Sequence, residues 1–343
     1  MDTKLLSIII PTYNMEKYLS RCLDSLLIKE NLNLLEIWVV NDGSKDNSSE
    51  IAHQYADKYP GVFHVIDKPN GNYGSCINAA LKVLTGKYVK VLDSDDYFNT
   101  DALINIIKRL KEANVDVILT DFTVKDITVG AESLAELNLI KNKEIELNQN
   151  EIPQFEMHAI IYKSSLLKDI SYQQTEGISY TDTEWTFYPM LKAKNLIYFK
   201  ENLYQYIMGR EGQTVGFESF CRNIEMMEQI LIRILDYLKQ EKKSLSPCHR
   251  HHAEDYIKIK LWAIYYNELI RRNKTNIEFL TKVDEKCKLY DISFYKSLQK
   301  PFLKKYYIVL FRSSIYVPIF LRRLSMKLAH IVQNRRKKRH STN

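Results

Sequence analysis

The first apolar run of the chain is residues 6–14, LSIIIPTYN, in which four aliphatic side chains lead directly into a polar turn. Two further runs have the same form: residues 37–44, IWVVNDGS, and residues 88–96, YVKVLDSDD. Short apolar runs that end in polar turns are typical of strands buried on both faces of a parallel sheet. These three stretches therefore predict a sheet whose strands end in polar side chains.

Segments with helical periodicity separate these runs. The expected strands are residues 7–10, 36–40, 63–67, 88–92 and 116–120, and the expected helices are residues 18–28, 48–59, 75–84 and 101–113, the last capped by Thr100. This alternation predicts an α/β domain with a mainly parallel sheet flanked by helices. The carboxyl ends of such strands meet at one edge of the sheet, where ligands bind. The polar turns at 11–14, 41–44 and 93–96 are therefore expected to share a site.

The later part of the chain is less regular. Residues 126–155 lose clear periodicity and predict an excursion from the sheet. Strands are expected again at residues 158–163, 196–199 and 203–207, with a short helix at 183–191, and helical spacing begins near residue 218. The expected organisation is a catalytic domain at 1–215 with halves at 1–125 and 126–215, a helical C-terminal region at 216–299, and a basic amphipathic tail at 300–343.

Composition and charge narrow the class of protein. The chain has 343 residues, of which 45% are hydrophobic and 27% charged, as in ordinary globular proteins. The net charge of +7 is unevenly distributed, because residues 300–343 hold twelve Lys or Arg and no acidic residue, which leaves 37 basic and 42 acidic residues in the rest. A basic tail on a mildly acidic body indicates an anionic partner for the tail.

The five cysteines are scattered and none forms a CxxC pair, so neither a disulfide framework nor a zinc site is expected. The N-terminus lacks the basic flank and cleavable apolar core of a signal peptide. We therefore expect reduced thiols and a cytoplasmic protein.

Three carboxylates follow the strand expected at 88–92: Asp93, Asp95 and Asp96. Such a cluster is costly unless a cation compensates it, and its hard oxygen ligands suit Mn²⁺ or Mg²⁺. The alternative is a polar turn that only caps the next helix. The second acidic turn at 42–44 and the polar residues 70–74 favour a ligand cleft.

Together, residues 7–14, 39–46, 70–78 and 92–96 closely resemble the family 2 glycosyltransferases, strongly over residues 5–125 and more weakly to about 215. The resemblance implies a GT-A type fold, a nucleotide-sugar donor, most commonly a UDP-sugar, a divalent cation and inversion at the anomeric carbon. It also implies a glycan, lipid-linked or wall-polymer acceptor of the bacterial surface. The residues that it assigns to the donor are Pro11, Tyr13, Asp42, Asn70, Gly74, Asn78 and Asp93, with Asp95 and Asp93 on the metal.

Inverting transfer needs a general base for the acceptor hydroxyl. Residues 177–185, GISYTDTEW, are similar to the Glu-Asp motif at which the family places its base, which makes Asp182 the first candidate. Thr181 stands where the family has Glu, so Glu184 remains a competing base. Both acids could instead complement the positive end of a helix.

Residues 204–214, YQYIMGREGQT, resemble a later segment of the family that carries an arginine. Because a guanidinium matches a phosphate group, Arg210 could bind the diphosphate or an anionic acceptor. A surface ion pair of Arg210 with Glu211 or Glu218 is equally compatible with the sequence.

The apolar stretches of the tail, 306–311 and 315–321, are interrupted by arginines before they reach the length of a membrane span. Such a pattern suits a segment that lies on an anionic membrane, so we expect peripheral contact with the inner face of the cell membrane. A helix packed on the catalytic domain is the alternative, and no nucleic acid is expected because no binding module accompanies the basic cluster.

Two other functions remain open from the sequence. A sugar nucleotidyltransferase would be expected to carry a Gly-rich basic loop after its first strand, where this chain has residues 11–14, PTYN. A catalytically degenerate subunit that only binds acceptor would have no need of Asp93, Asp95 and Asp182.

Overall fold

The computed structural model describes residues 4–137, 139–210, 212–213, 217–266, 268, 277–300, 308, 309 and 312. The chain divides into two compact units. The first unit contains residues 1–216 and 245–252, and the second contains residues 217–244 and 253–343. Residues 245–252, which the sequence placed in the helical region, are therefore part of the first unit.

A ten-stranded mixed sheet forms the centre of the first unit, with the path β3-β2-β1-β4-β9-β6-β10-β5 and with β7 and β8 at its sides. The pairs β1–β2, β2–β3, β1–β4 and β6–β10 are parallel, and the remaining pairs are antiparallel. The strands are β1 Leu6–Thr12, β2 Leu35–Asn41, β3 Phe63–Asp67, β4 Tyr88–Val91, β5 Tyr97–Phe98, β6 Val117–Asp126, β7 Ala131–Ala135, β8 Glu144–Glu146, β9 Ile160–Lys163 and β10 Asn195–Met208.

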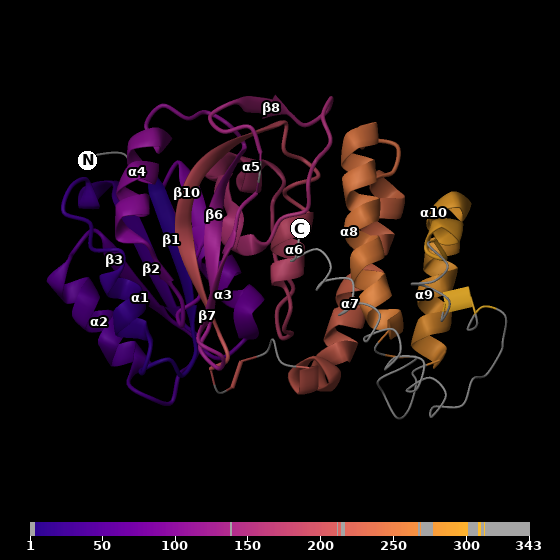
Figure 1. The fold of residues 1–343 in the computed structure, drawn as a ribbon. Coiled ribbons are helices and arrows are strands. Elements are labelled where there is room, and N and C mark those ends of the chain that lie inside the picture. Colours follow the sequence, from indigo (N-terminus) through magenta and orange to yellow (C-terminus); the bar gives the residue numbers. More distant parts are fainter. Residues whose placement is uncertain are drawn as a thin grey trace. The chain divides into compact units, whose positions relative to one another are not determined.

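Helices cover both faces of the sheet (Figure 1). The helices of the first unit are α1 Leu19–Asp24, α2 Ser48–Lys58, α3 Asn72–Leu81, α4 Thr100–Leu110, α5 Ser164–Asp169 and α6 Asp182–Phe187. Successive side chains of a strand point to opposite faces. Ile8 and Ile10 of β1 accordingly join the core under α1, α2 and α4, whereas Ile9 joins the core under α3, α5 and α6.

The helix α4 shows how the sequence pattern becomes packing. Leu103, Ile106 and Leu110 recur at helical spacing and are buried against the sheet. The cap of this helix is Asn99, whose Oδ1 accepts a hydrogen bond from the backbone N–H of Ala102 at 3.0 Å. The prediction of Thr100 as the cap was therefore wrong by one residue.

One buried carboxylate ties the first strands together. Glu36 of β2 accepts hydrogen bonds from Ser7 Oγ at 2.6 Å and from the backbone N–H and Oγ1 of Thr85 at 2.8 and 2.9 Å. Burial opposes the ionisation of Glu36, but these hydrogen bonds outweigh it and lower its pKa. The negative charge of this carboxylate therefore holds β1, β2 and the turn before β4 together.

The predicted strands and helices of residues 5–125 are confirmed, with differences at their ends. The third helix begins at Asn72, so part of the expected polar turn is the first turn of α3. The two short strands expected at 196–199 and 203–207 form the single strand β10, which is irregular between Phe199 and Tyr204. The mainly parallel sheet is mixed, because β9 runs antiparallel to both β4 and β6.

The prediction that residues 126–155 leave the sheet was wrong for two segments. The strand β7 pairs antiparallel with β6, and β8 pairs antiparallel with β10. Most side chains of β7 and β8 are exposed. The strand β7 lacks apolar alternation, and β8 has only three residues, fewer than the four to eight over which alternation indicates a strand.

The second unit is helical in its described residues, which confirms the helical C-terminal region. Its helices are α7 Phe217–Glu241, the part of α8 Pro247–Tyr266 after residue 252, α9 Ile277–Tyr290 and α10 Ile292–Ser297. Ile230, Ile234 and Leu238 form a buried stripe on α7, and Asp291 caps α10 by accepting two backbone hydrogen bonds.

The predictions for the tail at 300–343 lie almost entirely outside the described residues. Within the described part of the chain, no helix combines the length and the apolar character that crossing a membrane requires. The four cysteines whose state is described, Cys22, Cys76, Cys248 and Cys287, are free thiols.

Candidate active site

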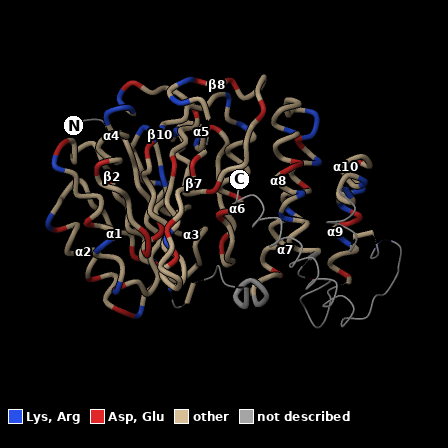
Figure 2. The backbone as a smooth tube through the Cα atoms, viewed as in Figure 1, with Lys and Arg blue, Asp and Glu red and all other residues tan. Residues whose placement is uncertain are grey.

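The acidic turn that follows β4 lies beside the end of β1. The backbone N–H of Asp96 donates to the carbonyl of Asp93 at 2.9 Å, which closes the turn. The hydroxyl of Ser94 donates to the carbonyl of Pro11 at 2.9 Å, which fastens the turn to β1. Figure 2 shows the resulting group of acidic segments at the ends of the strands between α1 and α3.

Asp96 anchors this turn to β10. The carboxylate is fully buried and accepts from the hydroxyl of Tyr204 at 2.7 Å and from the backbone N–H of Ile207 at 2.7 Å. Burial raises the pKa of Asp96, and the neighbouring charges of Asp95 and Asp93 raise it further. Because each of its oxygens has a hydrogen-bond donor, Asp96 fits a structural role.

Asp93 sits between α3 and β10. Its Oδ1 accepts from the hydroxyl of Tyr73 at 2.8 Å, and its backbone N–H donates to the hydroxyl of Tyr204 at 3.1 Å. Burial raises the pKa of Asp93, and the negative charges of Asp95 and Asp182 raise it further. Asp93 is therefore a carboxylate whose ionised form needs a compensating positive charge.

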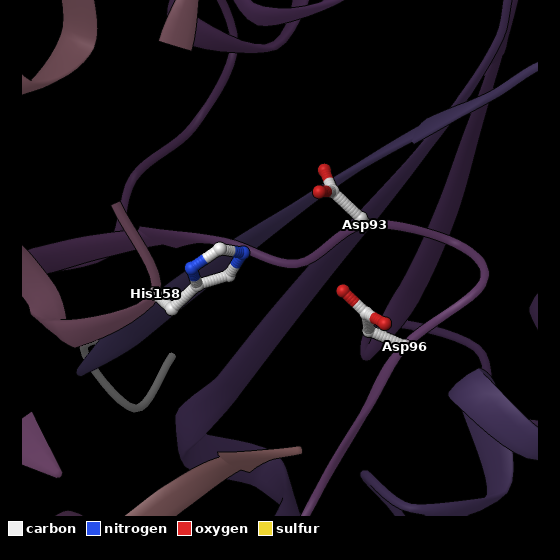
Figure 3. Close-up of side chains that lie close together, drawn as sticks. All are labelled: Asp93, Asp96 and His158. Atoms are coloured by element: carbon white, nitrogen blue, oxygen red, sulfur yellow. The ribbon is translucent and has the colours of Figure 1, made fainter. Parts of the chain in front are cut away.

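His158 completes a close group with the two carboxylates, as Figure 3 shows. One possible ligand atom each from Asp93, Asp96 and His158 lies within 4.8 Å of the other two. The His158 ring stacks on Tyr206 with 4.4 Å between ring centroids, and burial lowers the pKa of His158 to about 3. A neutral imidazole here adds no positive charge to the acidic turn.

Two arginines bring positive charge to Asp95. The guanidinium of Arg21 donates to the carbonyl of Asp95 at 2.6 Å, and Arg210 contacts its carboxylate. The Nε atom of Arg210 contacts Oδ2 of Asp95, and Gln213 Nε2 lies 3.4 Å from the same oxygen. The side chains of Arg210 and Asp95 are 13% and 9% exposed. The structure therefore brings Arg210 to the acidic turn.

The chemistry of this group fits a divalent cation. Three carboxylates lie within four residues, of which Asp95 and Asp96 are buried and Asp93 is half-buried. Burial raises the pKa of Asp93 and of Asp96, and the repulsion among the three carboxylates raises it further. Hard oxygen ligands of this kind suit Mn²⁺ or Mg²⁺. Both oxygens of Asp96 are used by Tyr204 and Ile207, and the assignment of Asp93 and Asp95 to a cation stays a prediction.

Asp42 and Asn70 meet at the ends of β2 and β3. Oδ1 of Asp42 accepts from Lys68 Nζ at 2.6 Å and from the backbone N–H of Gly71 at 2.9 Å, while Asn70 Nδ2 donates to the carbonyl of Asp42 at 3.0 Å. Lys68 was missed in the sequence, although it directly follows a predicted strand at the same edge. The side chain of Tyr13, at the end of β1, is 44% exposed.

Gly74 and Asn78 of α3 pack against residues 174–176, a contact that the sequence did not predict. A Cβ atom on Gly74 would lie 2.1 Å from the carbonyl oxygen of Thr175. Asn78 accepts from the backbone N–H of Gln174 at 2.9 Å and donates to its carbonyl at 2.9 Å and to Glu176 Oε1 at 2.8 Å. Both ends of the Asn78 amide are thus used within the protein.

The two candidate bases differ in their surroundings. Asp182 begins α6, is half-buried, and its carboxylate has no hydrogen-bond donor among the described residues. Its charge contributes to the raised pKa values of Asp93 and Tyr73, which burial raises first, so Asp182 lies near the acidic turn. Glu184 is 1% exposed, and its two oxygens accept from the backbone N–H and Oγ1 of Thr175, both at 2.7 Å.

Known proteins resemble this chain in sequence. The poly(ribitol-phosphate) beta-glucosyltransferase of Bacillus spizizenii is 29% identical over 288 residues, which are 82% of this chain and 42% of that protein. The poly(ribitol-phosphate) beta-N-acetylglucosaminyltransferase TarS of Staphylococcus aureus is 30% identical over 239 residues, which are 67% of this chain and 40% of that protein. This chain therefore spans less than half the length of these relatives.

The fold also has a solved counterpart. The crystal structure of S. aureus TarS 1–349 in complex with UDP-GlcNAc matches with a TM-score of 0.65 and 20% identity over 95% of this chain and 92% of that one. This similarity confirms the predicted GT-A type fold with a helical C-terminal region. Residues 7–171 match the family described as Glycosyl transferase family 2. Through these residues, the chain belongs to glycosyl transferase family 2.

Proposed function

We propose that this protein transfers a sugar from a UDP-sugar to a hydroxyl group of a bacterial surface polymer, with inversion at the anomeric carbon and with Asp182 as the general base. The two relatives are named for transfer to poly(ribitol-phosphate), which supports a polymer acceptor. The complex of TarS with UDP-GlcNAc supports a uridine nucleotide donor. The proposed acceptor is a glycan, a lipid-linked acceptor or a wall polymer.

One observation carries the choice of base. Of the two acids at the start of α6, only Asp182 has a carboxylate with no hydrogen-bond donor among the described residues, and its charge acts on Asp93. Glu184 is buried and receives two hydrogen bonds from Thr175. A general base must reach the proton that it removes, so an accessible carboxylate near the donor site fits this role better than a buried one.

The donor half of the reaction uses the acidic turn. Asp93 and Asp95 would hold Mn²⁺ or Mg²⁺, and such an ion neutralises the charge of the departing nucleotide diphosphate. Arg210, which contacts Asp95, is placed at the same turn and would turn its guanidinium to a diphosphate oxygen when the donor binds. Asp42 and Asn70 would line the part of the site that holds the nucleoside.

The acceptor half of the reaction uses Asp182. Its carboxylate removes the proton of the acceptor hydroxyl, and the oxygen forms a bond to the anomeric carbon. On the opposite side, the bond between that carbon and the diphosphate oxygen breaks, and its electron pair leaves with the nucleoside diphosphate. The proton remains on Asp182 until it passes to solvent, and the sugar is inverted because attack and departure occur on opposite faces.

Transfer and hydrolysis of UDP-sugars in the presence of Mn²⁺ test this proposal. Asp182→Asn should lower transfer by about 10² to 10⁴-fold, the usual contribution of a general base, and leave UDP affinity unchanged. Asp169→Asn on the exposed end of α5 makes the same chemical change away from the site and should be fully active. Full transfer activity in the Asp182→Asn variant would remove Asp182 as the base.

The metal assignment has its own test. Asp95→Ala should abolish the stimulation of turnover by Mn²⁺, and equal turnover of the variant and the native protein would overturn the assignment. Formation of a nucleotide sugar from UTP and a sugar phosphate would instead identify a nucleotidyltransferase. A chain that binds acceptor but neither transfers nor hydrolyses would identify a degenerate binding subunit.

A further inference from the structure

Residues 174–177 form a short bridge between α3 and α6. We propose that Asn78 and Glu184 are positioning residues that hold the general base Asp182 in place through this bridge. This inference rests on the proposed role of Asp182. It assigns Asn78 and Glu184 a function that differs from the donor contact and the base role expected from the sequence.

One set of hydrogen bonds fastens the bridge to α3 and to Gly71 just before it. The backbone N–H of Gly177 donates to the carbonyl of Gly71 at 2.8 Å. Asn78 makes three hydrogen bonds to Gln174 and Glu176, with lengths between 2.8 and 2.9 Å. These contacts lie at both ends of the bridge, so α3 fixes its position and its direction.

The absence of a side chain at Gly74 makes this close approach possible. A Cβ at Gly74 would lie 2.1 Å from the carbonyl oxygen of Thr175, far inside contact distance. The bridge is therefore pressed directly against the backbone of α3. No adjustable side chain lies between the bridge and the helix at this point.

A second set of hydrogen bonds fastens the bridge to the start of α6. Gln174 Nε2 donates to the carbonyl of Thr181 at 3.1 Å, and Thr175 donates twice to Glu184 at 2.7 Å. Thr181 and Glu184 flank Asp182 on either side along the chain. The backbone that carries the base is thus held on both sides by the same two bridge residues.

The start of α6 has little local support of its own. Thr181 occupies the N-cap position but makes no side-chain cap hydrogen bond, and α6 contains only six residues. A helix of this length gains its stability from tertiary contacts. The bridge supplies such contacts at the position of Asp182.

The same helix α3 also reaches the metal-binding turn. Tyr73 donates to Asp93 at 2.8 Å, one residue away from the glycine on which the bridge lies. The separation between the acidic turn and Asp182 is therefore set by contacts to a single helix. Such coupling matters because a reacting group displaced by about 1 Å can lose about 100-fold in rate.

A double-mutant cycle tests this inference. Asn78→Ala and Glu184→Gln should each lower kcat for transfer by about 10 to 100-fold, with unchanged affinity for UDP, because the base is displaced and the donor site is kept. In an Asp182→Asn background, the same substitutions should cause no further loss, because there is no base left to position. A shift of the pH profile of kcat in the single variants would accompany the loss.

Variants that remove different parts of this contact distinguish a loss of positioning from a loss of folding. Glu184→Gln keeps an oxygen that can accept from Thr175 and should retain more activity than Glu184→Ala. Thr175→Val removes only the hydroxyl contact and should resemble Glu184→Gln. The melting temperature of each variant, measured alongside kcat, separates lost folding from lost positioning.

The outcomes distinguish this inference from the proposed function. If the losses multiply in the Asp182→Asn background, Asn78 and Glu184 act independently of the base and the inference is overturned, while Asp182 remains the base. If Asp182→Asn is itself fully active, the proposed base fails. Wild-type kcat and pH profile in both single variants would also overturn the inference.

Discussion

Replacing Gly74 by alanine tests the contact between α3 and residues 174–177 most directly. The new Cβ would lie 2.1 Å from the carbonyl oxygen of Thr175. Ordinary carbon–oxygen contact begins near 3.4 Å, so the carbonyl must move away by about 1.3 Å. The displacement acts on the segment whose next hydrogen bonds hold Thr181 and Glu184.

A movement of this size should affect activity more than stability. Overpacking at a close contact costs roughly 1–3 kcal/mol in the free energy of unfolding. Misplacing a reacting group by about 1 Å can cost about 100-fold in rate. We therefore expect Gly74→Ala to lower kcat for transfer by about 100-fold while the protein remains folded.

The assay is the initial rate of sugar transfer, measured together with UDP affinity by calorimetry and with the melting temperature. Gly61→Ala is the matched control, because Gly61 has a positive φ of 77° and no atom within 4 Å of the added Cβ. The strain of alanine at that φ costs about 1–2 kcal/mol without touching the site. If Gly74→Ala and Gly61→Ala lose similar stability and both transfer sugar at the native rate, the reasoning is refuted.

Three further predictions concern pH, the cation and the tail. Hydrogen bonding lowers the pKa of Glu36 below 4.5, so ionised Glu36 stabilises the folded protein fully above that pH, and this stabilisation is lost as the pH falls through the folded pKa. Glu36→Gln should lower the free energy of unfolding by about 2 kcal/mol at pH 7 and reduce the acid dependence of chemical denaturation. Arg210→Ala should strengthen Mn²⁺ binding to the donor-free protein by at least about tenfold in a calorimetric titration, since the ion no longer competes for Asp95, and unchanged affinity would contradict this. Deleting residues 300–343 should abolish co-flotation with anionic vesicles, and a truncated protein that still floats would exclude the tail as the membrane contact.

The sequence predicted which polar residues meet at one edge of the sheet, because these residues directly follow strong strand signals. Asp42 and Asp93 each follow an apolar run, and strand order then brings the ends of β1, β2 and β4 together. Lys68 follows a weaker strand, β3, whose side chains are only partly buried. Its ion pair with Asp42 therefore had no clear signal in the sequence.

The acceptor side could not be predicted to the same depth. Asp182 and Glu184 are two residues apart and chemically alike, so no local pattern separates them. Their difference comes from Thr175, which occupies both oxygens of Glu184. The strand β7 was missed because its exposed side chains do not alternate, and β8 was missed because it has only three residues.

The sequence by itself determined the α/β architecture, the family and the edge of the sheet at which the acidic turn lies, because apolar periodicity and short motifs are local properties. Only the tertiary structure decided how each acid is used. It assigned Asp96 to Tyr204 and Ile207, brought Arg210 to Asp95, and placed residues 174–177 against α3. The partner of a side chain depends on contacts between residues as many as 118 positions apart, which no local pattern encodes.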